Sequence, residues 1–393
     1  MKNIRISSID ILRALTMLLM IWVNDFWTLT GVPKWLEHAS ASEDYLGFSD
    51  VIFPLFLFIV GLSIPLAVQQ RKNAGNSNYT IAKHIIIRSV SLLLIGVFMV
   101  NYETAHNENL LIGKYWWCIL MALAVALIWV YWERSPIPKK YHSVLQVFGL
   151  LILIFLATIY KGGTTGDQWM TTQWWGILGL IGWAYLINAL VYLFAKGNLY
   201  IIIGIFLLFN TLSVLNELDA LPQLNGYISY FTTIYTGTIP AFTSAGIVAT
   251  LVFKKLAVNN SKWILPTLTV LGIITLTYGI MTRSIWGISK IQGTPSWVAI
   301  CSGIGFISFA ALYFIADIKK QINWAKIIAP AGTATLTCYM IPYFVYPLRE
   351  ITGFRFPEFM NTGMVGLIGS LIIALLIVIF TGWLEKKGYK LKL

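Results

Sequence analysis

Charged residues are scarce in this chain of 393 residues, since only 11% are Asp, Glu, Lys or Arg while 58% are hydrophobic. A soluble protein of this length carries roughly a quarter charged residues. The composition therefore excludes an ordinary soluble domain. It predicts an all-α polytopic membrane protein whose main surroundings are the lipid bilayer.

Cysteine and histidine are also rare, with three of the first and four of the second. The cysteines, Cys118, Cys301 and Cys338, show no paired spacing, so they define neither a disulfide framework nor a metal site. The histidines have no metal-ligand spacing, and HExxH, Walker and GxGxxG patterns are missing. We therefore expect no metal, and the sequence does not support nucleotide-driven chemistry.

Acidic residues are fewer than basic ones, 16 against 28, which gives a net charge of +12. Such an excess can indicate nucleic-acid binding. Here the lysines and arginines collect in alternate short loops, and the loops between them are mostly acidic or mixed. This is the positive-inside pattern of membrane proteins. We therefore expect no nucleic-acid partner and place both termini on the cytoplasmic side.

About twelve apolar runs, within a range of 10–12, have the roughly 20-residue length that a transmembrane helix needs. No internal repeat is visible, and no linker is long enough to hold a soluble domain. Residues 1–393 are thus expected to form a single transmembrane domain. The expected spans are 9–29, 46–68, 81–101, 113–132, 143–160, 174–195, 199–215, 236–256, 263–282, 296–317, 326–348 and 363–384.

The first two spans carry polar residues that a bilayer normally excludes: Asp10, Arg13, Asn24, Asp25 and Asp50. Such residues are by default a hypothesis about function. On a helix, Asp10, Arg13 and Asn24 share one face, with Asn24 ~21 Å from Asp10. We expect Asp10 and Arg13 to pair at one membrane surface, as a structural or a functional pair. Asn24 lies at the other, as a site residue or a helix-end cap.

His38 lies in the compact outer loop between these two spans, within chain reach of Asn24 and Asp50. A neutral imidazole can act as a general base or a nucleophile when a partner fixes its tautomer. Asp50 or Asp25 could be that partner, and Asn24 could donate to a developing oxyanion. The alternative is an interfacial histidine without a catalytic part.

Other outer residues are candidates for substrate contacts. Trp27 and Trp35 flank the His38 loop and could stack on a sugar, whereas most other tryptophans fit an interfacial belt. Arg283 and Lys290 place two cations in an outer loop, against the charge rule. They either bind an anionic group of a substrate or have no role in binding.

Two motifs in the first part of the chain indicate a family. The segment SIDILRALTMLLMIWVN, followed by WLEHAS and FSDVIFPLFLFIVGLSI, closely resembles the transmembrane acetyltransferases typified by heparan-α-glucosaminide N-acetyltransferase, bacterial homologues included. GTPSWVAICSGIGFISFAALYFIADI and GTATLTCYMIPYF are similar to the C-terminal half of the same family. The resemblance implies a helical enzyme that takes acetyl from cytosolic acetyl-CoA and delivers it to the amino group of a glucosamine across the membrane.

The resemblance also implies roles for single residues. His38 matches the family's active histidine, Asn24 the asparagine that ends the first helix, and Asp50 the aspartate before the apolar run. A homodimer is implied as well. The chain shows no N-terminal luminal domain, which favours the bacterial cytoplasmic (inner) membrane over a lysosomal one.

We therefore expect His38 to be the base or a transient acetyl carrier, with Asp50 orienting it and Asn24 polarising the carbonyl. The phosphates of coenzyme A need cations on the inner side, for which Arg13, Arg71 and Lys72 are the candidates. The candidates for acceptor binding are Asp25, Trp27, Trp35, Arg283 and Lys290.

Two other functions remain open. Asp10-Ile11-Leu12-Arg13 is similar to the Asp-x-x-Arg element of O-acyltransferases that modify cell-envelope polysaccharide. A secondary sugar transporter would also explain intramembrane charges, but the missing repeat of two similar halves counts against it.

Overall fold

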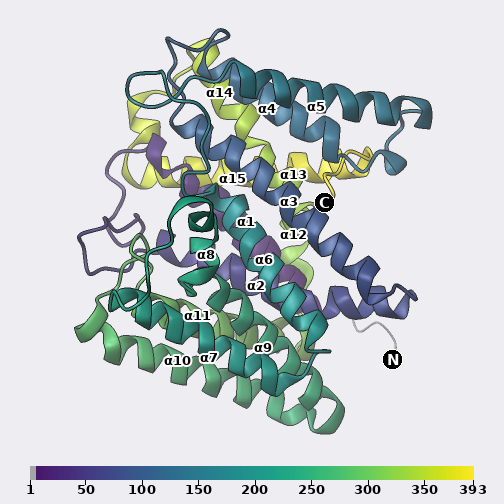
Figure 1. Cartoon of the computed structure of the whole chain (residues 1–393), viewed down its shortest axis with the longest axis vertical. Helices are drawn as coiled ribbons and strands as arrows, with labels where there is room; N and C mark the ends of the chain where they lie inside the picture. Colours follow the sequence, from purple (N-terminus) through teal and green to yellow (C-terminus); the bar gives the residue numbers. More distant parts are fainter. Residues whose placement is uncertain (1–5) are drawn as a thin grey trace.

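The structure is a computed structural model that describes residues 6–393, and it is built from helices joined by loops (Figure 1). The β-pairing within these residues consists of isolated bridges. The helices are α1 (Ser7–Asn24), α2 (Ser49–Asn73), α3 (Asn78–Glu103), α4 (Lys114–Trp129), α5 (His142–Thr158), α6 (Gly176–Phe194), α7 (Leu199–Glu217), α8 (Thr232–Tyr235), α9 (Thr238–Asn259), α10 (Ile264–Trp286), α11 (Pro295–Leu312), α12 (Ala329–Thr333), α13 (Thr335–Met340), α14 (Pro342–Thr352) and α15 (Gly363–Lys386).

Nine helices in the described part of the chain are long and apolar enough to cross a membrane, judged by length and composition. They coincide with nine of the expected spans, so the prediction of an all-α polytopic membrane fold is confirmed. Two further expected spans are α1 and the shorter apolar helix α4. The sidedness of both termini stays a prediction.

The one expected span still to be placed, 326–348, is divided into the short helices α12, α13 and α14. Ala334 leaves helical geometry between the first two, and Pro342 begins the third at a position where proline needs no hydrogen-bond partner. Gly332 brings α12 against α1, because a Cβ there would lie 2.8 Å from the Asp10 carbonyl oxygen. Broken helices are tolerated at membrane depth where they are buried or line a cavity.

The centre of the molecule is the close packing of α2 against α9. A Cβ on Gly61 would lie 2.0 Å from the Thr243 carbonyl oxygen, and one on Gly246 would lie 2.0 Å from that of Phe58. Glycine therefore lets the two backbones touch, as small residues do in membrane interfaces. The Thr243 and Thr250 hydroxyls donate to main-chain oxygens of α2. These contacts hold α2 rigidly, and with it Asp50 in its first turn.

The outer helices expose most of their apolar surface. In the apolar 18-residue stretch of each helix, only 17% of the residues are buried in α5, 17% in α7 and 22% in α10. In Figure 1, α5 lies at one end of the molecule and α7 and α10 at the other, with α1, α2 and α6 between them. In a membrane protein such faces are covered by lipid.

Candidate active site

His38 and Asp50 form a hydrogen-bonded pair where the first outer loop meets α2. The imidazole Nδ1 lies 2.7 Å from Asp50 Oδ1. Asp50 Oδ2 accepts hydrogen bonds from the main-chain N–H groups of Ala39 and Gly47, at 2.9 and 3.2 Å. The carboxylate is therefore 1% exposed but fully hydrogen-bonded, while the His38 side chain is 46% exposed. Of the two partners that the sequence left open, the structure places Asp50 on His38.

Lys290, from the loop between α10 and α11, reaches the same pair. Its Nζ lies 3.1 Å from His38 Nδ1 and 3.7 Å from Asp50 Oδ1. Burial lowers the pKa of Lys290, and the neighbouring Asp50 carboxylate only partly opposes this shift. The cation that the sequence assigned to substrate binding thus lies against the histidine–aspartate pair.

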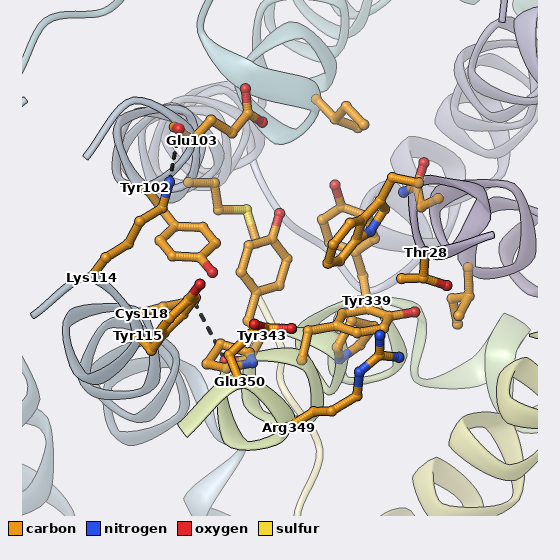
Figure 2. Close-up of a pocket in the computed structure, with 18 of the residues that line it drawn as sticks. Thr28, Tyr102, Glu103, Lys114, Tyr115, Cys118, Tyr339, Tyr343, Arg349 and Glu350 are labelled. Carbon is orange, nitrogen blue, oxygen red and sulfur yellow. Dashed lines mark hydrogen bonds between the residues drawn. The ribbon is translucent and has the colours of Figure 1, made fainter. Parts of the chain in front are cut away.

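A cavity of about 860 Å³ opens beside the end of α1, and we call it the aromatic cavity. Asn24, Trp27 and Thr28 line one side of it. Figure 2 shows tyrosine, acidic and basic side chains from α3, α4, α13 and α14 around it. Its other principal lining residues are Tyr102, Glu103, Lys114, Tyr115, Cys118, Tyr339, Tyr343, Tyr346, Arg349, Glu350 and Arg355. Aromatic surfaces with a few converging polar groups are typical of small-molecule sites.

Asp25 supports the wall of this cavity. Its Oδ1 accepts a hydrogen bond of 2.8 Å from the Tyr346 hydroxyl and one of 3.2 Å from Thr28. The Trp27 ring meets Tyr346 edge-to-face, with centroids 5.7 Å apart. Asp25 therefore links the end of α1 to α14, and its carboxylate is not the partner of His38.

The charged groups of the aromatic cavity are unequally paired. Arg355 holds both carboxylate oxygens of Glu350, at 3.0 and 2.7 Å. Lys114 Nζ donates to the Glu103 main-chain oxygen at 3.1 Å. Arg349 Nε is buried and has no hydrogen-bond partner among the described residues. Among these groups, Arg349 therefore keeps an unused hydrogen-bond donor in the cavity lining.

A second hollow of about 410 Å³, which we call the basic cleft, lies along α1, α2, α3 and α6. Arg13 sits in it, 3.5 Å from Asp10 Oδ1 and 2.6 Å from the Ser63 hydroxyl, so the expected Asp10–Arg13 pair is present. Its cationic or imidazole-bearing lining residues are Arg13, Arg71, His84, Arg88, Lys390 and Lys392. Lys72 does not line the cleft, although Arg71 does.

The two hollows lie next to each other inside the molecule and share part of their lining. Ile177 of α6 and Tyr339 of α13 line both of them. Helix α1 also contributes to both, with Met20 in the basic cleft and Ile21 in the aromatic cavity. Tyr339, only 6% exposed, therefore forms part of a thin partition between a cationic and an aromatic compartment.

Comparison with known proteins gives a family for the first part of the chain. Residues 5–174 match the family described as "Heparan-alpha-glucosaminide N-acetyltransferase, catalytic". The resemblance expected from the sequence is confirmed over these residues. The heparan-alpha-glucosaminide N-acetyltransferases of Homo sapiens and Mus musculus are each 34% identical to this chain over 97 residues. That segment is 25% of this chain and spans only 14% of each relative's length.

The residues expected to form one constellation lie in two places. His38 and Asp50 are together, with Lys290, whereas Asn24 and Trp27 line the aromatic cavity. No hydrogen bond joins Asn24 to His38 in the part of the chain that the structure describes. The loop that starts at Asn24 in the cavity wall and ends at Asp50 connects the two groups through the chain.

Besides Asp25 and Lys290, two more candidate substrate contacts do not line the aromatic cavity. Trp35 is 60% exposed and does not line it. Arg283 is bound to Asp44, with its Nε 2.9 Å from Oδ2 and its Nη2 2.9 Å from the main-chain oxygen. Asp44 lies 239 positions before Arg283 in the chain, so this ion pair could not be recognised from the sequence.

The sequence interpretation missed the tyrosine wall of the aromatic cavity. Tyr339, Tyr343 and Tyr346 follow one another at spacings of four and three residues, so they share one helical face. That periodicity was a readable signal for an aromatic face. It did not show that the face borders a cavity, because a run of large residues in a membrane span is usually packed against other helices. Arg88, Lys390 and Lys392 of the basic cleft were also missed.

Proposed function

We propose that this protein is a membrane acetyltransferase that moves an acetyl group from acetyl-CoA to the amino group of a glucosamine-containing sugar. The family match over residues 5–174 supports the class of reaction. The observation that carries the proposal is the meeting of the basic cleft and the aromatic cavity at Tyr339, with Asn24 on the aromatic side. A donor and an acceptor can therefore approach each other from separate compartments.

The basic cleft is suited to the donor. Coenzyme A carries several phosphate charges, which arginine binds through paired hydrogen bonds. Arg88 Nε is buried without a hydrogen-bond partner in the described structure, so this guanidinium keeps a donor that an anionic group could use. Of the three cations expected to bind the phosphates, Arg13 and Arg71 line the cleft and Lys72 does not.

The aromatic cavity is suited to the acceptor. Trp27 and the tyrosine wall offer apolar faces to a sugar ring, and the charged groups at the rim can bind its hydroxyl and amino groups. Because Trp35 and Arg283 lie outside the cavity, the proposal assigns the acceptor to Trp27 and α14 instead. Asp25 acts indirectly, by fixing the Tyr346 hydroxyl.

Acetyl transfer requires that the amine lose a proton, that the oxyanion be stabilised and that water be excluded. In the proposed reaction the amine nitrogen bonds to the acetyl carbon, the carbon–sulfur bond breaks, and coenzyme A leaves as the thiolate. Asn24 donates to the carbonyl oxygen. We assign the uptake of the amine proton to Nε2 of His38, because its Nδ1–H is held by Asp50. His38 lines neither hollow, so this step requires the sugar amine to reach the loop that carries His38. In the two-step form of the reaction, the same Nε2 carries the acetyl group first.

A second candidate, a secondary sugar transporter, is favoured by one observation. A broken helix between two stacked hollows is typical of transporter binding sites. The enzyme is preferred because of the family match. Uptake of labelled glucosamine into vesicles that lack acetyl-CoA would support the transporter.

The test of the proposed function is acetyl transfer by the purified protein from labelled acetyl-CoA. Glucosamine should accept the label, and N-acetylglucosamine, whose amine is already blocked, should not. Equal labelling of both sugars would indicate transfer to a hydroxyl and support an O-acyltransferase. No transfer to either, with acetyl-CoA bound or unbound, would contradict an acetyltransferase acting on amino sugars.

A further inference from the structure

His38 Nδ1 has two competing neighbours, and one nitrogen cannot satisfy both. Asp50 Oδ1 lies 2.7 Å from it and needs a proton between the two atoms. Lys290 Nζ lies 3.1 Å from it and can only donate. A separation of 2.7 Å is that of a charge-assisted hydrogen bond, so Nδ1 carries the proton and gives it to Asp50. The Lys290 ammonium then faces the imidazole without a hydrogen bond to it.

This arrangement makes the charge of Lys290 important for His38. Protonation of Nε2 would create an imidazolium directly beside the ammonium group, which like-charge repulsion disfavours. Asp50 alone would have the opposite effect, because a carboxylate favours the charged form of its histidine partner. Lys290 Nζ is also 3.7 Å from Asp50 Oδ1, so its charge offsets that of the carboxylate.

Two further ion pairs lie on the segments around His38. Lys34 binds Glu43, and Arg283 binds Asp44. From α11, the buried Cys301 thiol interacts with both Asp50 and Lys290. Glu37 precedes His38 on its own segment. Lys290 is thus the cation that acts on the imidazole, and Asp50 is its buried anion.

We propose that Lys290 is a positioning residue that keeps His38 uncharged, so that Nε2 stays free to accept a proton or an acetyl group. Asp50 fixes the tautomer of the His38 imidazole, and Lys290 keeps that imidazole neutral. This inference rests on the proposed function for its meaning in catalysis. The protonation of His38 itself can be measured without any activity. From the sequence, Lys290 was expected either to bind an anionic group of the substrate or to have no role in binding; here it acts on His38 instead.

The test follows the rate of modification of His38 by diethylpyrocarbonate as a function of pH. The reagent attacks the unprotonated imidazole, and mass spectrometry of the peptide that contains His38 reads the modified fraction. Lys290→Met should raise the midpoint of this profile by about one pH unit or more, because a positive neighbour has been removed. Lys290→Arg keeps the charge and should keep the wild-type midpoint. His142, which contacts Trp132 and Ile137, provides the reference in the same digest.

The pH below which kcat/KM falls should rise together with the modification midpoint in Lys290→Met. It should stay at the wild-type pH in Lys290→Arg. If Lys290 only ties its loop to α2, Lys290→Met and Lys290→Gln will lower the melting temperature and leave the His38 midpoint unchanged. That result would overturn the inference, and Lys290→Gln covers the case in which Lys290→Met does not fold. If the wild type transfers no acetyl group but the midpoint shifts, the proposed function fails and the effect of Lys290 stands.

Discussion

At the scale of residues, Asn24 and His38 begin and end one short piece of chain but have different surroundings. Asn24 lines the aromatic cavity beside Trp27, whereas His38 is held by Asp50 at the start of α2. The account therefore separates two tasks. In the proposed reaction, Asn24 would stabilise the carbonyl oxygen of the acetyl group, and His38 would accept the proton or the acetyl group itself.

Asn24→Ala should lower kcat for acetyl transfer by about 10²–10³-fold, which is the usual loss when one oxyanion donor is removed. The KM for acetyl-CoA should change little, because Asn24 does not line the basic cleft. Asn361→Ala is the matched control, since Asn361 lines the same cavity. Equal losses in both variants would show a general effect on the cavity and not a specific role of Asn24.

Two neighbouring cations allow a sharp test of the donor site. Arg71→Gln should raise the KM for acetyl-CoA about tenfold or more, because it removes a charged hydrogen-bond donor from the basic cleft. Lys72→Gln should leave that KM near the wild-type value, because Lys72 does not line the cleft. Steady-state kinetics with varied acetyl-CoA measure both. The reverse order of effects would place the coenzyme elsewhere.

Sequence reasoning anticipated a contact between site residues where the two lie close together in the chain. His38 and Asp50 are 12 positions apart, so chain length alone brought them within reach. The contact between Lys290 and His38 could not be found in this way, because 252 positions separate the two residues. Contacts over such separations depend on helix packing, which apolar runs do not specify.

At the scale of elements, α2 and α9 form the rigid support on which His38 and Asp50 rest. Their backbones touch at Gly61 and Gly246. The apolar runs predicted where both helices lie but not that they pack at these glycines, because an apolar span looks the same whether it faces lipid or protein. The break in 326–348 was hidden for the same reason, since α12, α13 and α14 together remain apolar.

Gly246→Ala should destabilise the protein by at least about 2 kcal/mol, because a Cβ there would overlap the Phe58 carbonyl oxygen and force α2 and α9 apart. Gly204→Ala in α7 is the matched control. Nothing lies within 4 Å of a Cβ at Gly204, so alanine should be neutral or slightly stabilising there. Thermal unfolding in detergent compares the two. A melting temperature of Gly246→Ala equal to that of Gly204→Ala would contradict the close packing.

At the scale of the whole molecule, we propose that the basic cleft and the aromatic cavity bind two different ligands. The cationic lining of one suits phosphate groups, and the tyrosine wall of the other suits a sugar. Tyr339 and Ile177 separate them by a single layer of side chains. The alternating loop charges predict that the cleft opens to the cytoplasmic side and the cavity to the opposite side.

The most direct test of this account is a sided transfer measurement in sealed proteoliposomes with the protein in one orientation. Labelled acetyl-CoA is supplied on the side of the basic cleft, and a membrane-impermeant glucosamine conjugate is enclosed on the other. The account predicts labelled product on the side of the sugar, and none when acetyl-CoA is given on that side alone. Product formed only when both ligands share one side would contradict transfer between the two compartments.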